Sequence, residues 1–360
     1  MSAMVSLELV RLTKAWPLET VDVSLEAEAG KVLAVAGPSG CGKSTMLRMV
    51  AGLERPDSGK LFVGGIDVTS TEPSGRGIGM VFQDYALFPH LDVFGNVAYG
   101  LRVRRMRRVE LRARVGSLLA AVGLAGYERR KPHELSGGER QRVALARTLA
   151  VEPAVVLFDE PLSSLDAALR KRLRADIVEE QRRLGFTAVY VTHDLEEAMA
   201  IGDTLAVMDS GKVLQCATPR ELWENPASAA VARFMGSGPC LPIVCFERAG
   251  GHLFAVTETG KFPIDDDNAA DGSFLFFERG AAEPTTTPGL PGAVSGPSGH
   301  DDGHGVMAAR CLRADFAGDV VDCAMQTGGE RFTLRFRKGR APEAGEERLY
   351  RVNPTSVRVL

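Results

Sequence analysis

The segment Gly37–Thr45, with the sequence GPSGCGKST, restricts the fold of this chain more than any other feature. It fits the pattern GxxxxGK[ST] and lies between an apolar, valine-rich run at 31–37 and a helical pattern at 43–52. Its glycines let backbone N–H groups curl around phosphate oxygens, and the helix points its positive N-terminal end at the same anion. The motif predicts a P-loop, in which Lys43 reaches the β- and γ-phosphates of a nucleotide and Ser44 ligates Mg²⁺. The residues expected to hold the nucleotide here are Gly37, Pro38, Ser39, Gly40, Cys41, Gly42, Lys43, Ser44 and Thr45.

A second group of polar residues follows the uninterrupted apolar run Val155–Phe158. An acidic residue that leaves a buried strand beside a P-loop is placed to hold Mg²⁺, usually through water, and Asp159 fits that role. Glu160 is then placed to orient or deprotonate the water that attacks the γ-phosphate. Together with the P-loop, the pair predicts an ATPase or a GTPase.

The pattern of apolar runs predicts an α/β architecture for the first two thirds of the chain. Short strands are expected at 31–37, 78–82, 155–158 and 188–191, and a hairpin at 60–69 around Gly64 and Gly65. Strands without polar interruption that alternate with helices indicate a mostly parallel sheet covered on both faces. From 92 to 150 the pattern becomes helical, and Ser136 is a candidate N-cap for a helix that runs to Ala150.

Composition excludes several classes of protein. The 360 residues carry a formal net charge of -3, so the whole chain shows no basic footprint of the kind that nucleic-acid binding requires. No run approaches the roughly 20 apolar residues that span a bilayer, and the N-terminus has no signal-peptide core. The six cysteines form no CxxC pair, which favours free thiols in a reducing compartment. We therefore expect the chain itself to stay in the cytoplasm and to reach a membrane only through partners.

The segment Leu135–Gln141, LSGGERQ, decides between the branches of P-loop proteins, because it resembles the signature of ABC transporter ATPases. Further matches to that family follow in the expected order. Gln83 lies in a segment similar to the Q-loop, Asp166 in one similar to the D-loop, and His193 resembles the switch histidine. Trp16 stands where the family places an aromatic residue that stacks on adenine. The matches extend over residues 1 to about 235.

The resemblance implies a mechanism that spacing alone does not. Two copies associate head to tail, and each ATP is held by the P-loop of one copy and by the signature of the other. Gln83 ligates Mg²⁺ together with Ser44 and Asp159, His193 contacts the γ-phosphate and supports the attack by Glu160, and Asp166 crosses the dimer interface. The signature residues implied to contact the ATP of the other subunit are Ser136, Gly137, Gly138 and Glu139.

The resemblance also implies partners. The homodimer works with two transmembrane permease subunits at the cytoplasmic face of the inner membrane, and indirectly with an extracytoplasmic solute-binding protein. The basic stretch 102–108, RVRRMRR, is either a solvated helix face or part of the docking surface for a permease. No nucleic-acid partner is expected.

The remainder of the chain is expected to be a second domain. The fold prediction is an α/β P-loop NTPase of the ABC ATPase type at 1–235, with a helical insert at about 92–150. A mostly β, OB-like domain follows at 236–360, with strands at 253–257, 274–277, 331–337 and 348–352. The segment 283–305 is rich in Pro, Gly, Ser and Thr, which predicts a flexible loop. Its cluster of histidine and aspartate at 300–304 is either a metal site or a solvated loop tip.

The Q-loop region 82–91 resembles that of bacterial importers for iron, polyamines, sulfate and sugars, and the tail resembles their regulatory domain. The junction 234–239, FMGSGP, lacks the pattern typical of sugar importers, so ferric iron or a polyamine is favoured as solute. Where the family often has Arg-Pro-Glu, this chain reads Phe277-Glu-Arg-Gly280, which leaves open whether the tail binds a regulator. The alternatives are a soluble ABC ATPase of the repair or translation type and a nucleotide-dependent regulatory protein.

Overall fold

The computed structural model describes residues 4–17, 19–163, 167–249, 252–264, 273–285, 305–353 and 356–360. The chain divides into two compact units, Met1–Pro219 and Arg220–Leu360. Each unit has its own hydrophobic core, so each is described by itself.

The first unit is built on one sheet of ten strands within the described residues, in the order β5-β4-β1-β2-β10-β9-β3-β8-β7-β6. Its strands are β1 (Leu7–Ala15), β2 (Thr20–Ala27), β3 (Val32–Ala36), β4 (Ser58–Val63), β5 (Ile66–Asp67), β6 (Ile78–Val81), β7 (Val155–Asp159), β8 (Thr187–Thr192), β9 (Thr204–Asp209) and β10 (Lys212–Ala217). The predicted parallel sheet is present from β9 to β6, where neighbouring strands run parallel. The strands from β5 to β2 pair antiparallel and extend it. The hairpin predicted at 60–69 is present as β4 and β5, whereas the sequence patterns did not predict the pairing of β4 with β1 and of β1 with β2.

Helices cover both faces of the parallel strands, as predicted. The helices of this unit are α1 (Lys43–Ala51), α2 (Val93–Val103), α3 (Arg108–Ala121), α4 (Gly137–Ala150), α5 (Ala167–Leu184) and α6 (Leu195–Ile201), with 3-10 turns at Pro73–Gly75 and Pro132–Glu134. Helix α1 packs Met46 and Leu47 in one core with Leu157 of β7. The next residue of that strand, Phe158, points to the other face and packs in a second core with Ile177 of α5. This alternation follows from the period of two in a strand, and it is why both faces of β7 are apolar.

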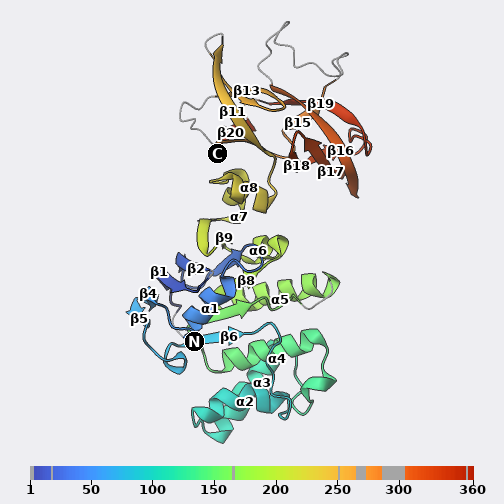
Figure 1. Ribbon diagram of the computed structural model, residues 1–360. Helices are drawn as coiled ribbons and strands as arrows, with labels where there is room; N and C mark the ends of the chain where they lie inside the picture. Colours follow the sequence, from blue (N-terminus) through green and yellow to red (C-terminus); the bar gives the residue numbers. More distant parts are fainter. Residues whose placement is uncertain are drawn as a thin grey trace. The chain divides into compact units, whose positions relative to one another are not determined.

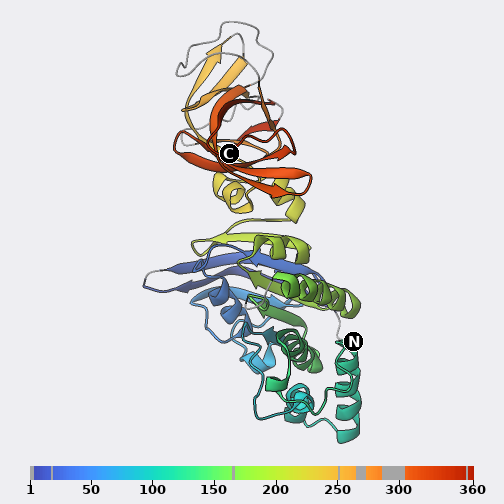
Figure 2. The ribbon, with the colours of Figure 1, turned by 90° about the vertical axis from the view of Figure 1, so that its right-hand side faces the viewer.

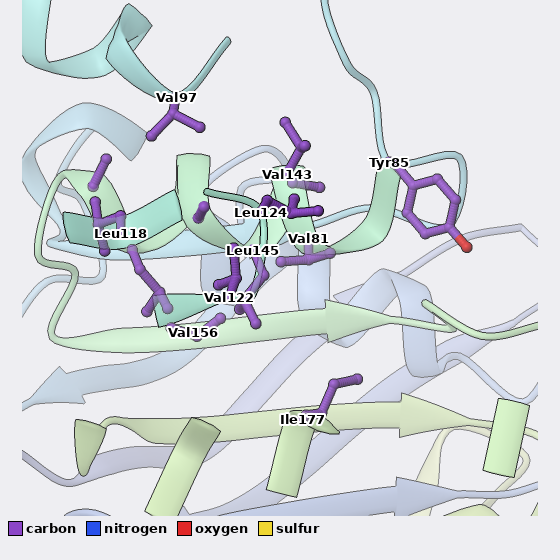
Figure 3. Close-up of a cluster of buried hydrophobic side chains, with 14 of the residues drawn as sticks. Val81, Tyr85, Val97, Leu118, Val122, Leu124, Val143, Leu145, Val156 and Ile177 are labelled. Carbon is purple, nitrogen blue, oxygen red and sulfur yellow. The ribbon is translucent and has the colours of Figure 1, made fainter. Parts of the chain in front are cut away.

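The helices α2, α3 and α4 form a group of their own within the first unit, beside the β6 edge (Figures 1 and 2). Figure 3 shows that the core below them is continuous with the sheet, since Val97, Leu118 and Leu145 share one cluster with Val81 of β6 and Val156 of β7. A helical insert at about 92–150 was predicted, and these three helices lie within it. No helix in the described part of the chain is both long and apolar enough to cross a membrane.

The second unit is predominantly β, as predicted. It contains one sheet in the order β13-β12-β11-β14-β20 and another in the order β15-β19-β16-β17-β18. The strands are β11 (Cys240–Ala249), β12 (His252–Thr257), β13 (Gly260–Ile264), β14 (Phe274–Phe277), β15 (Ala282–Pro284), β16 (Gly305–Ala317), β17 (Val320–Thr327), β18 (Glu330–Arg337), β19 (Glu347–Val352) and β20 (Val357–Val359). Strand β17 alternates half-buried and buried residues, which is typical of antiparallel sheets with one face on a core.

The two short helices α7 (Pro219–Glu224) and α8 (Ala229–Met235) precede these strands. The compact division falls at residue 219 and not at the expected boundary of 235, because Ala229 and Ala232 of α8 pack in one cluster with Cys240 and Phe276. Most of the expected loop at 283–305, with the cluster at 300–304, lies outside the described residues.

Candidate active site

The loop between β3 and α1 is shaped for close backbone approach. Gly42 has φ 95° and caps α1, a conformation that side-chain-bearing residues rarely adopt. A Cβ added at Gly37 would lie 2.0 Å from the carbonyl oxygen of Met208, so only glycine fits there. The strand β3, buried at every residue, fixes one end of the loop and α1 fixes the other. The expected strand–loop–helix context of the motif is therefore present.

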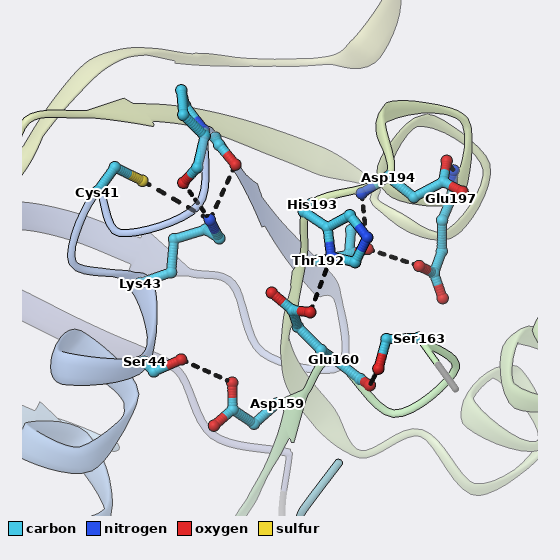
Figure 4. Close-up of polar contacts among 12 residues, drawn as sticks. Cys41, Lys43, Ser44, Asp159, Glu160, Ser163, Thr192, His193, Asp194 and Glu197 are labelled. Carbon is cyan, nitrogen blue, oxygen red and sulfur yellow. Dashed lines mark hydrogen bonds and ion pairs between the residues drawn. The ribbon is translucent and has the colours of Figure 1, made fainter. Parts of the chain in front are cut away.

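Lys43 is the buried cation of this loop, with 5% of its surface exposed. Its ammonium group donates hydrogen bonds to the carbonyl oxygens of Gly37 at 2.8 Å and Pro38 at 2.7 Å (Figure 4). The thiol of Cys41 lies 3.7 Å from the same nitrogen. These contacts hold the positive charge inside the curve of the loop, where the backbone N–H groups and the start of α1 also favour an anion.

Ser44 and Asp159 meet at the carboxyl end of β7. The Ser44 hydroxyl donates to Asp159 Oδ1 at 3.1 Å. Burial, together with the charge of the neighbouring Glu160, raises the pKa of the Asp159 carboxyl, while the Ser44 hydrogen bond opposes that rise. A hydroxyl and a half-buried carboxylate are hard oxygen ligands, so this pair fits Mg²⁺.

Glu160 and His193 form a second pair, contributed by adjacent parallel strands. His193 Nδ1 lies 2.8 Å from Glu160 Oε2 (Figure 4). The Glu160 N–H donates to the carbonyl oxygen of Val191 at 3.0 Å. Glu160 has φ 45°, a costly conformation for a residue with a Cβ, and strained residues of this kind cluster at functional sites. The turn aims the carboxylate at His193, whose side chain is 48% exposed.

Two hydrogen bonds within the signature segment form a capping box at the start of α4. Ser136 caps α4: its hydroxyl accepts from the Glu139 N–H at 3.3 Å, and Glu139 Oε2 accepts from the Ser136 N–H at 2.7 Å. Those hydrogen bonds, with the Ser136 N–H foremost, lower the pKa of the Glu139 carboxyl. Ser136 is exposed, so the N-terminal end of α4 is open to a ligand from outside.

Comparison with known proteins decides the family. Residues 20–163 match the family model described as ABC transporter. The "Fe(3+) ions import ATP-binding protein FbpC" of Agrobacterium fabrum is 44% identical over 306 residues, which are 85% of this chain and 83% of that protein. The chain belongs to the family of ABC transporter ATP-binding subunits. It is thus an ATPase, and its partners are membrane permease subunits.

Other relatives carry related names. The "Fe(3+) ions import ATP-binding protein FbpC 1" of Rhizobium meliloti is 57% identical over 215 residues, 60% of this chain and 61% of that one. An "sn-glycerol-3-phosphate import ATP-binding protein UgpC" of Cupriavidus necator is 48% identical over 250 residues, 69% of this chain and 68% of its own. The structure is similar to that of CbiO1 of Clostridium perfringens, described as part of an ABC transporter complex, with a TM-score of 0.57, 29% identity, and coverage of 61% of this chain and 90% of that one.

The other residues that the sequence singled out in this ABC ATPase have no recorded hydrogen bond, among the described residues, to Lys43, Asp159, Glu160 or His193. Trp16 is 46% exposed, and the Lys14 ammonium lies 5.2 Å from the centre of its ring. The segment that carries it lies against the P-loop, because a Cβ at Gly42 would be 3.2 Å from Glu19 Oε1. Gln83 is exposed just after β6. Asp166 lies outside the described residues.

Sequence reasoning missed the network that holds His193. Glu197 of α6 is 3% exposed and accepts from the hydroxyl of Tyr190. It also accepts from the Thr192 hydroxyl at 2.6 Å (Figure 4). Asp194 caps α6 by accepting from the Glu197 N–H at 3.1 Å. His193 is thereby fixed between a strand end and a capped helix. The acidic start of α6 was the available signal, but a helical pattern does not show that one of its glutamates is buried.

Replacing Glu197 with alanine is expected to lower the melting temperature of this ABC ATPase by several degrees. Two buried hydroxyls lose their acceptor, and an unsatisfied buried polar group costs about 1–3 kcal/mol. Below the melting temperature, turnover is expected to fall more than ATP affinity, because His193 loses its support. Calorimetry and phosphate release measure the two effects. Glu196→Ala is the matched control, since Glu196 is exposed on the same helix; equal melting temperatures of the two variants would refute the role of Glu197.

Proposed function

We propose that this chain hydrolyses MgATP as one half of a homodimer and thereby energises the import of ferric iron through a membrane permease. The observation that carries the proposal is the meeting of Lys43, Ser44 and Asp159 with the Glu160–His193 pair at one end of the parallel strands. In open α/β sheets, ligands bind at the carboxyl ends of the strands.

The chemistry assigned to these residues is hydrolysis of the terminal phosphoanhydride. A water oxygen forms a bond to the γ-phosphorus while the bond from that phosphorus to the bridging β–γ oxygen breaks. Glu160 orients the water and accepts its proton, and ADP leaves with the electron pair of the broken bond. Lys43 and the P-loop N–H groups balance the charge on the phosphates, and His193 holds Glu160 in position and contacts the γ-phosphate.

Mg²⁺ fits the oxygen donors of this site. Ser44 and Asp159 would hold it, Asp159 through water, and Gln83 would be a further ligand. The ion supplies neutralisation of charge on the β- and γ-phosphate oxygens. The raised pKa of the Asp159 carboxyl is consistent with a half-buried acid that gains from a nearby cation.

The dimer explains why the signature of this chain stands open. The exposed Ser136 and the N–H groups at the start of α4 offer donors for the γ-phosphate bound by the other copy. Gly137 and Gly138 let that phosphate approach the backbone, and Asp166 is assigned to the interface. The homodimer would lie at the cytoplasmic face of the membrane and contact two permease subunits. An extracytoplasmic solute-binding protein would deliver the solute to those permease subunits.

Ferric iron is the proposed solute because the relatives from Agrobacterium and Rhizobium are named as Fe(3+) import proteins. The test is uptake of radiolabelled ferric iron by a strain that lacks this gene, with spermidine and sn-glycerol 3-phosphate as comparison solutes. Loss of iron uptake alone, restored by the intact gene but not by a Glu160→Gln copy, is the expected result. Loss of another solute would replace iron in the proposal. Unchanged uptake of all three, with no permease co-purifying, would favour an ABC ATPase that acts outside transport.

A further inference from the structure

The second unit contains a cavity that the ATPase cycle does not use. Its volume is about 430 Å³, within the range of about 300–1,000 Å³ that is usual for small-molecule sites. It lies between the end of α8, the turn after β14 and the start of β18; α8 and β18 are labelled in Figure 1. The residues that line it are Arg233, Gly236, Gly238, Cys240, Arg279, Glu330, Arg331, Phe332 and Thr333.

Charge is the first unusual property of this cavity. Three guanidinium groups and one carboxylate line it, which leaves two positive charges in excess. Arg233 engages the single acid, since its Nη2 lies 3.4 Å from Glu330 Oε1, and its guanidinium carbon lies 4.7 Å from the centre of the Phe274 ring. The excess therefore rests on Arg279 and Arg331.

Arg279 has no carboxylate of its own among the residues that the structure describes. Its recorded side-chain contact is with the ring of Trp223, whose centre lies 5.4 Å from the guanidinium carbon. The nearby Asp322 is held by Arg335 through hydrogen bonds of 2.7 and 2.8 Å. Burial lowers the pKa of the Arg279 guanidinium; the charge of Asp322 opposes that shift, and the charge of Arg335 adds to it. Partly buried charges are normally paired, and here Arg279 and Arg335 share the single charge of Asp322, both of whose oxygens bond to Arg335, so a bound anion would complete the compensation.

Two glycines shape the wall around Arg279. Gly236 has φ 60°, and a Cβ there would lie 2.4 Å from Arg279 Nη2. A Cβ at Gly238 would lie 1.9 Å from the carbonyl oxygen of Phe277. The Gly236 N–H donates to the carbonyl oxygens of Ala232 and Arg233 in the last turn of α8. The guanidinium group of Arg279 thus lies close to the glycine backbone at the end of α8.

We propose that this cavity binds a small tetrahedral dianion, a phosphate group that is free or carried by a small phosphomonoester, with Arg279 as its principal ligand. A guanidinium fork matches phosphate with two parallel hydrogen bonds, and two excess charges balance a dianion better than a monocarboxylate. The site belongs to the predominantly β unit and does not depend on which solute the transporter carries.

The test is titration calorimetry of the full chain with inorganic phosphate, sn-glycerol 3-phosphate and acetate. It is done at pH 8, above the second phosphate pKa of about 6 for a phosphomonoester. A saturating, non-hydrolysable MgATP analogue fills the P-loop and the γ-phosphate position, so that phosphate binding there does not contribute. Both phosphates are expected to bind with sub-millimolar affinity and acetate at least tenfold more weakly. Binding by inorganic phosphate alone would assign the free anion, and stronger binding of the ester would assign the phosphomonoester. No binding of either up to about 10 mM would overturn the proposal.

Variants separate a ligand role from a structural one. Arg279→Gln is expected to weaken phosphate binding at least tenfold, and Arg279→Lys less, because it keeps the charge but loses the fork. The melting temperature without ligand should be unchanged or higher in Arg279→Gln, since an uncompensated charge is removed. Arg337→Gln is the matched control: Arg337 is exposed on the same β18, outside the cavity. Equal binding by Arg279→Gln and Arg337→Gln, or a lower melting temperature with unchanged binding, would show that Arg279 is structural.

Discussion

Glu160→Gln is expected to bind ATP with nearly unchanged affinity and to hydrolyse it at least about 100-fold more slowly, since a positioned general base commonly contributes 10²–10⁴-fold. The amide keeps the shape of the carboxylate and can retain the 2.8 Å contact with His193 Nδ1. It cannot accept the proton of the attacking water. The effect should therefore appear in turnover and not in binding.

The measurement is phosphate release at saturating ATP together with binding of a fluorescent ATP analogue. With ATP, the variant should also elute as a dimer in size-exclusion chromatography, because the γ-phosphate held by both subunits persists. Glu152→Gln is a closely matched control: Glu152 is an exposed glutamate with φ 50°, and its partner is Arg114, 2.8 Å away. It makes the same chemical change in the same backbone conformation. Equal turnover of the two variants would remove Glu160 from the reaction, and a Glu160→Gln protein that stays monomeric with ATP would count against the shared site.

Lys43→Ala is expected to reduce ATP affinity about 100-fold, since loss of charge-assisted hydrogen bonds to the phosphates costs about 3 kcal/mol. Hydrolysis should become undetectable, because the same charge is needed as negative charge redistributes over the phosphates in the transition state. The change also removes two hydrogen bonds within the loop, to the carbonyl oxygens of Gly37 and Pro38. Some loss of stability is therefore expected with the loss of function.

Calorimetric unfolding distinguishes these effects. Lys31→Ala is the control, because Lys31 lies just before β3, at the end opposite the P-loop, and is exposed beside Asp203. A folded Lys43→Ala protein with undiminished ATP affinity would contradict the assignment of the loop. If the Lys43→Ala variant does not fold, the same measurements are made on Lys43→Met, which keeps the buried aliphatic part of the side chain.

The predictable parts of this structure are those in which local sequence carries the signal. The apolar runs at 155–158 and 188–191 lie in β7 and β8, because central parallel strands are buried on both faces. The Ser136 cap of α4 was equally predictable, since its pattern is confined to one turn. The P-loop motif lies between an apolar run and a helical pattern, and the structure contains the expected strand and helix on either side of it.

What the sequence could not supply depends on contacts between distant segments. Nothing in the alternation of β2 indicates that it pairs with β1 on one side and β10 on the other. The positive φ of Glu160 is set by the packing of two strand ends, and no residue preference predicts it at a glutamate. Glu197 was overlooked because an acidic residue in the first turn of a helix is normally exposed. In the second unit, the sequence could not show that the carboxylate near Arg279, that of Asp322, is hydrogen-bonded to Arg335.

The register between β7 and β8 makes the catalytic pair a sensitive reporter of correct folding. Asp159 stands opposite Val191, so Glu160 is level with Thr192 and His193 follows one residue further along the neighbouring strand. A slip of one residue would displace one strand by about 3.3 Å and turn its side chains to the opposite face. Such a misfolded sheet would still bury valine and leucine on both faces and keep its apolar character, yet its glutamate and histidine would no longer meet. Recovery of ATP turnover after denaturation therefore counts molecules whose strands are in register, whereas compactness or secondary-structure content would count both populations.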